Sequence, residues 1–154
     1  MKVVERSALV PYSPQQMYDL VNDVDRYPDF LPWCTAAHVE PAAPGEVLAS
    51  ISIARGVLRT EFTTRNALRP GEEIMMRLVR GPFRNLTGNW NFSAIAGCGS
   101  RVGFRVSFEF KSLLASAALN PIFETLCGSI VDAFVARAKV VYATPQAAPS
   151  AGPC

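Results

Sequence analysis

The feature that most constrains the fold is a series of period-two segments between residues 35 and 111. Six stretches alternate apolar and polar side chains, and short turns containing glycine or proline separate them. No helical spacing intervenes, which disfavours a parallel sheet with crossover helices. The pattern predicts an antiparallel meander with strands over 36–42, 46–54, 57–68, 72–79, 84–95 and 100–111.

The last of these strands shows the two faces of the sheet most clearly. Successive side chains of a strand point to opposite faces. One face carries Val102, Phe104, Val106, Phe108 and Phe110. The other carries Arg101, Arg105, Ser107, Glu109 and Lys111. The sheet is therefore predicted to have one aromatic face to bury and one solvated, partly basic face.

A strand over 2–10 and two helices complete the prediction. Ser13 as N-cap, Pro14 in the first turn and Gln16 in a capping box start a helix after Pro11. The segment 112–143 reads as a helix of roughly 45 Å at 1.5 Å per residue. Pro121 predicts a kink or a restart within it, because proline cannot donate the backbone hydrogen bond.

These elements predict one α+β domain over 1–143, in which a curved antiparallel sheet of about seven strands wraps around the long C-terminal helix. The Pro/Ala-rich tail 144–154 is predicted to be disordered. Small residues on the helix, such as Ala117, Ala118, Gly128 and Ala133, face a concave sheet and leave room for a cavity. A filled core fits the pattern equally well.

Composition narrows the functional classes. The sequence has four scattered cysteines and one histidine, His38, so a clustered zinc site is not expected, and no catalytic triad or nucleotide-binding glycine motif occurs. No apolar run approaches the roughly 20 residues that span a bilayer. Residues 51–111 carry ten basic and four acidic side chains, which points to an anionic partner or to a solvated sheet face. We expect a cytoplasmic protein.

One short segment, "DVDRYPDFLPWC" at 23–34, concentrates large apolar side chains between prolines and aspartates. It is too interrupted for a strand and too rich in proline for a long helix. The segment is therefore predicted to be a loop whose aromatic side chains pack onto the rest of the domain.

Three motifs in order resemble one known family. "YPDFLPWC", "GPFRNLTGNWNF" and "FEFKSLLASAALNPIF" with "VDAFVARA" resemble the coenzyme-Q-binding START-like family of the polyketide cyclase/dehydrase superfamily, which includes RatA-type ribosome-association toxins. The resemblance spans about residues 1–143. It implies a helix-grip fold, a cavity between the sheet and the C-terminal helix, and binding of a polyisoprenoid quinone, with the aromatic loop near the cavity mouth.

The resemblance and the strand parities together predict the ligand contacts. The predicted contacts are Tyr27, Phe30, Leu31, Trp33, Phe62, Met76, Trp90, Phe92, Phe104, Phe108, Phe123, Leu126, Ile130 and Phe134. The aromatic residues of 27–33 would form a lid, or equally a permanent seal. Thr60 and Thr64, and also Ser50 or Ser52 with parity unassigned, are candidates for a hydrogen bond to the ligand.

Three functional classes follow. The first is a protein that binds ubiquinone as a ligand rather than as a catalytic cofactor, supports its delivery or use in respiration, and contacts the inner membrane only peripherally. The second is a toxin, paired with an antitoxin, that binds a ribosomal subunit without contacting DNA, through an anion-binding face of Arg55, Arg59, Arg65, Arg77 and Arg105. The third is a polyketide aromatase or cyclase, the weakest case because no acid–base pair can be named.

Overall fold

The computed structural model describes residues 1–96 and 99–143, and the predicted disordered tail 144–154 lies outside these residues. The described residues form an α+β domain of seven strands, two α-helices and a short 3-10 helix. The elements in order are β1 Lys2–Val10, α1 Pro14–Asn22, η1 Val24–Asp29, β2 Cys34–Pro41, β3 Glu46–Arg55, β4 Leu58–Arg69, β5 Glu73–Arg80, β6 Phe83–Ala94, β7 Ser100–Phe110 and α2 Leu113–Val141.

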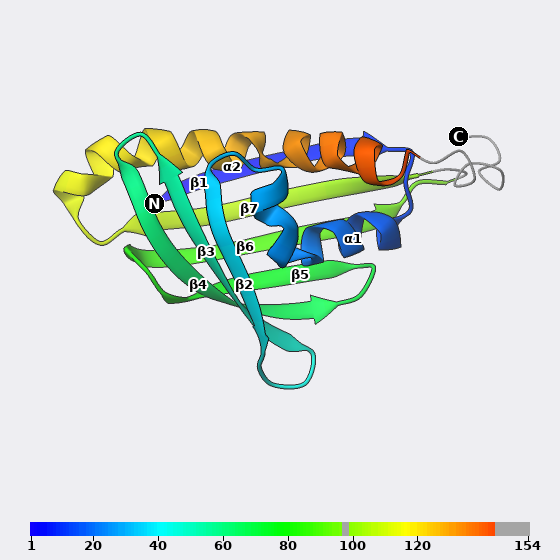
Figure 1. The fold of residues 1–154 in the computed structure, drawn as a ribbon, viewed down its shortest axis with the longest axis horizontal. Helices are drawn as coiled ribbons and strands as arrows, with labels where there is room; N and C mark the ends of the chain where they lie inside the picture. Colours follow the sequence, from blue (N-terminus) through cyan, green and yellow to red (C-terminus); the bar gives the residue numbers. More distant parts are fainter. Residues whose placement is uncertain (97–98, 144–154) are drawn as a thin grey trace.

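The strands form one antiparallel sheet in the order β1-β7-β6-β5-β4-β3-β2. Strands β2 to β7 are therefore the predicted meander, and β1 pairs with β7 and forms one edge of the sheet. Both α-helices lie on one face, with α2 running along β1 and β7 and α1 packing beside it on β6 (Figure 1). We call this covered side the inner face and the opposite side the outer face.

Helix α1 begins as its sequence predicts. Ser13 accepts a hydrogen bond from the backbone of Gln16 at 3.0 Å, and the Gln16 side chain accepts one from the Ser13 backbone at 2.9 Å. Pro14 occupies the first turn. This reciprocal cap satisfies two backbone donors that would otherwise lack partners at the helix start.

The aromatic segment is more regular than a loop. Residues Val24–Asp29 form the 3-10 helix η1, which includes Pro28. The helix is short because the 3-10 hydrogen bonds have poor geometry and because proline removes a donor. It packs against β2 and places Tyr27 in the core.

Helix α2 is a single 29-residue helix that continues through Pro121 without a restart. An 18-residue window of it has a mean hydropathy of 1.3, so by length and composition alone it could span a membrane, contrary to the prediction from the sequence. Its buried residues Phe123, Leu126, Val131 and Phe134 pack on the inner face of the sheet. The apolar character of α2 is thus explained in part by its place in the core.

The inner face is occupied by aromatic rings, as the alternation predicts. Phe83, Phe108 and Phe110 are almost fully buried, and Phe123 of α2 meets Phe108 edge-on with ring centroids 4.7 Å apart. Edge-on pairs of this kind add about 0.5–1.5 kcal/mol beyond the area they bury. The aromatic cluster therefore anchors α2 to β6 and β7.

Phe108→Asp is expected to abolish cooperative unfolding, because it places an unpaired carboxylate at a position that is 0% exposed. The expected cost of about 4 kcal/mol or more is a large part of the stability of a typical domain. Thermal unfolding followed by circular dichroism measures it. Ser107→Asp, on the outer face of the same strand, is the matched control and should unfold normally; equal behaviour of the two variants would contradict the strand parity.

Candidate functional site

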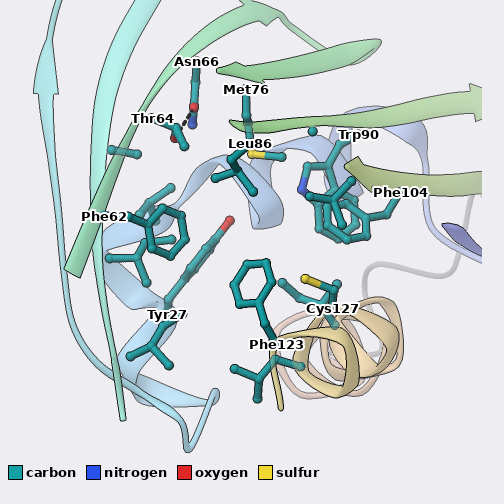
Figure 2. A pocket seen from close by; sticks show the side chains of 18 of the residues that line it. Tyr27, Phe62, Thr64, Asn66, Met76, Leu86, Trp90, Phe104, Phe123 and Cys127 are labelled. Atoms are coloured by element: carbon teal, nitrogen blue, oxygen red, sulfur yellow. Dashed lines mark hydrogen bonds between the residues drawn. The ribbon is translucent and has the colours of Figure 1, made fainter. Parts of the chain in front are cut away.

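An apolar cavity of about 90 Å³ lies between the inner face of the sheet and α2. Figure 2 shows aromatic side chains around it: Tyr27 enters from η1, Phe62 and Trp90 from the sheet, and Phe123 from α2. Trp33, in the turn before β2, and Phe104 of β7 also line the cavity. The cavity therefore occupies the place that the family resemblance implies.

The wall combines residues of the sheet, of α2 and of η1. Most of the predicted ligand contacts are part of it: Tyr27, Trp33, Phe62, Met76, Trp90, Phe104, Phe123, Leu126 and Ile130. The predictions did not name the wall residues Val24, Ala49, Ile51, Ile53, Asn66, Leu86, Gly88, Val106 and Cys127. Thr64, named only as a polar candidate, also lines the cavity.

The structure places the other predicted contacts outside the wall, namely Phe30, Leu31, Phe92, Phe108 and Phe134. Phe134 lies behind the wall, with its ring centroid 5.3 Å from those of both Tyr27 and Trp90. Phe30 packs on Phe134 at 5.2 Å and lies under the Arg137 guanidinium at 5.0 Å. These two rings support the wall without reaching the cavity.

The remaining three exceptions, Leu31, Phe92 and Phe108, are buried in the core outside the cavity wall. Phe92 meets Tyr18 of α1 edge-on at 5.8 Å, and Phe108 belongs to the cluster around Phe123. Leu31 is 1% exposed and packs in the core. Strand parity correctly places residues on the inner face, but the inner face is longer than the cavity.

The strand register assigns the polar candidates for a ligand hydrogen bond to different faces of the sheet. Ala49, Ile51 and Ile53 of β3 point inward, so Ser50 and Ser52 belong to the outer face, where the Ser50 and Thr63 hydroxyls hydrogen-bond at 2.7 Å. Thr60 pairs in register with Ile53 but lies outside the cavity wall. The alternation of serine and isoleucine in β3 was the signal that could have fixed this parity.

The aromatic segment is held closed in this structure. The buried Tyr27 hydroxyl donates a hydrogen bond to the Val21 carbonyl of α1, and burial raises the pKa of that phenol. The Tyr27 carbonyl accepts from the Leu31 backbone at 2.9 Å, and the Trp33 carbonyl accepts from Ala54 at 2.9 Å. The segment thus forms a seal bonded to α1 on one side and to β3 on the other.

Two buried cysteines are protonated at neutral pH. Burial, with a smaller effect of Glu124, raises the pKa of the Cys127 thiol to about 12, and burial raises that of Cys34 to about 11. Both thiols are free. A thiol that stays protonated is a poor nucleophile and a poor metal ligand, and the described residues contain no cluster of three metal-ligating side chains.

The five arginines of the predicted anion-binding face are not equivalent. Arg59, Arg77 and Arg105 are exposed on the outer face. Arg65 is half-buried and pairs with Glu46 at 3.2 Å. Arg55 ends β3 opposite Leu58, an inner-face position, so alternation separates it from the others.

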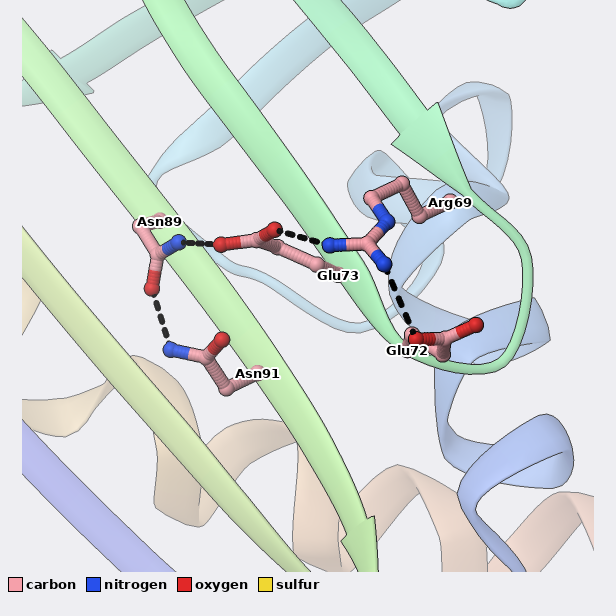
Figure 3. Close-up of polar contacts among 5 residues, drawn as sticks. All are labelled: Arg69, Glu72, Glu73, Asn89 and Asn91. Carbon is pink, nitrogen blue, oxygen red and sulfur yellow. Dashed lines mark hydrogen bonds and ion pairs between the residues drawn. The ribbon is translucent and has the colours of Figure 1, made fainter.

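Acidic and amide groups interrupt the basic character of the outer face (Figure 3). Arg69 forms ion pairs with Glu72 at 3.3 Å and Glu73 at 3.5 Å, and Glu73 also accepts a hydrogen bond from Asn89. Asn91 donates to Asn89 in turn. His38 is exposed, 3.9 Å from Glu40, and lies outside the cavity wall.

A long C-terminal helix held in an antiparallel sheet, with an apolar cavity between them, defines the helix-grip class of hydrophobic-ligand-binding proteins. The family described as "Polyketide cyclase / dehydrase and lipid transport" matches residues 10–135, and the chain belongs to this family.

Relatives within the family carry different names. The chain is 42% identical over 142 residues to the ribosome association toxin RatA of Escherichia coli K12, covering 92% of this chain and 90% of that one. It is 30% identical to the mitochondrial coenzyme Q-binding protein COQ10 homolog B of Xenopus laevis, covering 88% of this chain but 57% of that one. The Zhui aromatase/cyclase of Streptomyces sp. R1128 shares the fold, with a TM-score of 0.78, 16% identity and coverage of 90% and 95%.

The buried thiol at Cys127 predicts a loss of stability at alkaline pH. Its folded pKa of about 12 lies above the ordinary value of 9.0, so between these values the unfolded chain binds fewer protons and unfolding becomes easier as pH rises. The slope contributed is at most about 1.4 kcal/mol per pH unit. Urea unfolding between pH 8 and 11 should show a smaller decline for Cys127→Val than for the unsubstituted protein; identical slopes would contradict the buried thiol.

Proposed function

We propose that this protein binds a polyisoprenoid quinone such as ubiquinone in the cavity and supports its delivery or use in respiration. The observation that carries the proposal is the apolar cavity walled by Tyr27, Phe62, Trp90 and Phe123. Aromatic walls suit a flat ring, and apolar walls suit an isoprenoid tail. The name of the COQ10 relative, a coenzyme Q-binding protein, supports the same ligand class.

The cavity must expand to take this ligand. An apolar cavity of roughly 150 Å³ holds one benzene, and this cavity measures about 90 Å³. Met76 is the most adaptable wall residue, because its unbranched side chain has several rotatable bonds. Binding on this proposal therefore displaces Met76 and opens the seal formed by Tyr27 and Trp33.

Purification from quinone-replete source cells, followed by organic extraction and mass spectrometry, tests the proposal directly. We expect a quinone at close to one molecule per chain. Each buried methylene contributes about 0.8 kcal/mol, so a few isoprene units give enough affinity to survive purification. An empty cavity from such cells would contradict the proposal.

Gly88→Ala is expected to weaken quinone binding about fivefold or more while preserving the fold. A Cβ at Gly88 would lie 2.6 Å from the Met76 terminal methyl and so would push that flexible side chain into the cavity. The sequence contains two tryptophans, Trp33 and Trp90, and both line the cavity. Quenching of tryptophan fluorescence by decylubiquinone therefore reports binding.

The matched control is Gly103→Ala on the outer face of β7. A Cβ there meets its nearest neighbour, the Asn91 Cβ, at 4.0 Å, an ordinary contact. The control should bind decylubiquinone like the unsubstituted protein. Equal affinity of the two alanine variants would show that the ligand does not occupy the space beside Met76.

A second function, association with a ribosomal subunit, is favoured by the 42% identity to a protein named ribosome association toxin. On this proposal the exposed outer-face arginines Arg59, Arg77 and Arg105 contact RNA phosphates, and an antitoxin protein would control the activity. Both functions agree with a cytoplasmic location, which forms part of the proposal.

Arg59→Glu and Arg77→Glu are each expected to weaken ribosome association about tenfold, because each replaces a phosphate contact by a repulsive charge. Sedimentation of ribosomal subunits in a sucrose gradient measures the effect on subunit joining. Arg26→Glu on η1 makes the same charge change away from the sheet and should have no effect. If both sheet variants associate with the ribosome normally, these arginines do not contact RNA and are only solvated surface residues.

We favour binding over catalysis for the cavity. Among the described residues its wall contains no carboxylate, histidine, lysine or arginine, so a general acid or base for a cyclase reaction would have to be Tyr27 or Cys127. Burial raises the pKa of both groups. A high pKa at both positions makes proton abstraction at neutral pH inefficient, which supports a binding role.

A further inference from the structure

Two neutral polar side chains lie in the otherwise aromatic and aliphatic wall of the cavity. Thr64 and Asn66 follow Phe62 on the inner face of β4, and they are 5% and 4% exposed. Thr64 Oγ1 donates a hydrogen bond to Asn66 Oδ1 at 2.7 Å. Figure 2 shows the pair together at one side of the cavity, next to Met76.

The hydrogen bond between them leaves the Asn66 amide nitrogen free to donate. A side-chain amide has two N–H donors, and a threonine hydroxyl has one proton, which here points to Asn66 Oδ1. Among the hydrogen bonds of the described residues, none uses Asn66 Nδ2. The pair therefore presents the two N–H donors of the amide to the cavity. Among the described residues, the side-chain polar atom that is fully buried without a partner is Ser100 Oγ, so Asn66 Nδ2 keeps access to the space of the cavity, where a ligand acceptor would pair with it.

The neighbouring side chains supply no acceptor. Across the strands, Thr64 pairs in register with Ala49 of β3, and Asn66 pairs with Met76 of β5. Both neighbours are apolar apart from the weakly accepting thioether of Met76. The partner best suited to Asn66 Nδ2 is therefore an oxygen acceptor on the molecule that fills the cavity.

We propose that Asn66, positioned by Thr64, makes the cavity selective for apolar ligands that carry a carbonyl oxygen. This inference rests on the proposed function and deepens it, because a quinone ring offers carbonyl oxygens that only accept hydrogen bonds. Asn66 is the specificity-determining residue, and Thr64 is a positioning residue. An apolar molecule of the same shape without the oxygen would leave the amide unpaired.

The amide also gives a physical reason for a ligand to leave a membrane. An isoprenoid tail gains nearly as much from the hydrocarbon of a bilayer as from an apolar cavity. The bilayer core, however, offers no hydrogen-bond donors to a buried carbonyl. A donor inside the cavity therefore adds an interaction that hydrocarbon lacks.

Three probes test the selectivity: decylubiquinone, decanophenone with a single ketone attached to its ring, and decylbenzene with no oxygen. The full chain is titrated in detergent, with tryptophan fluorescence for decylubiquinone and isothermal titration calorimetry for all three probes. We expect the carbonyl probes to bind about tenfold more tightly than decylbenzene. Asn66→Leu should reduce this preference to less than about twofold and retain decylbenzene binding, which also shows that the variant is folded.

Infrared spectroscopy of bound decanophenone gives a signature that a purely structural role would not produce. A carbonyl that accepts a hydrogen bond absorbs at lower frequency, so the stretch should be lower in the unsubstituted protein than in Asn66→Leu. Thr64→Val should weaken the shift, because it frees the amide to rotate. Thr63→Val is the matched control, since it removes a buried hydroxyl from the outer face of the same strand and should leave the shift intact.

The outcomes separate the inference from the quinone proposal. A tenfold preference for decylubiquinone that survives Asn66→Leu would support quinone binding and overturn the role of Asn66. An Asn66-dependent preference for decanophenone without binding of decylubiquinone would support the role of Asn66 and refute the quinone. Equal binding of all three probes, or binding of none, would overturn the inference.

Discussion

Burial of the aromatic inner face of the sheet against α2 is the interaction on which the rest of the structure depends. Alternation in β7 places Phe108 and Phe110 on the face that α2 covers. A register shift between Phe83 and Asn85 of β6 brings Phe83 to the same face, where Phe123 meets all three rings. At the other end Phe134 packs against Trp90. These contacts hold α2 at both ends of the inner face, and the cavity lies between them.

The space between the two aromatic groups persists because small side chains line part of it. Ala49 and Gly88 belong to the sheet side, and Cys127 belongs to α2. An unfilled cavity costs roughly 24 cal/mol per Å³, or about 2 kcal/mol for a volume of about 90 Å³. A leucine at one of these positions could fill the space, so the small residues are better explained by a ligand than by stability.

The strand meander, the capping box at Ser13 and the inner face of β7 were predictable from the sequence, because each follows from a local pattern with a fixed period. The sequence did not predict where along the inner face a residue lies. Phe108 and Phe104 share that face, but only Phe104 lines the cavity. Asn66 was missed for another reason. It lies on a strand where Thr63 is also buried, so polarity alone does not distinguish the two faces.

Period-two alternation also keeps the two proposed functions physically separate on the same strands. Met76 of β5 lines the cavity, and its neighbour Arg77 is exposed on the outer face. On β4, Asn66 lines the cavity, and the half-buried Arg65 lies on the outer face. Substitutions on one face that preserve the fold therefore leave the side chains of the other face in place. A ligand that fills the cavity stabilises the folded state of the whole domain. Quinone binding would therefore stabilise the folded sheet that carries the outer-face arginines, without contacting them. The two proposed functions are compatible in one domain, because strands β4 and β5 contribute alternate side chains to the cavity and to the outer face.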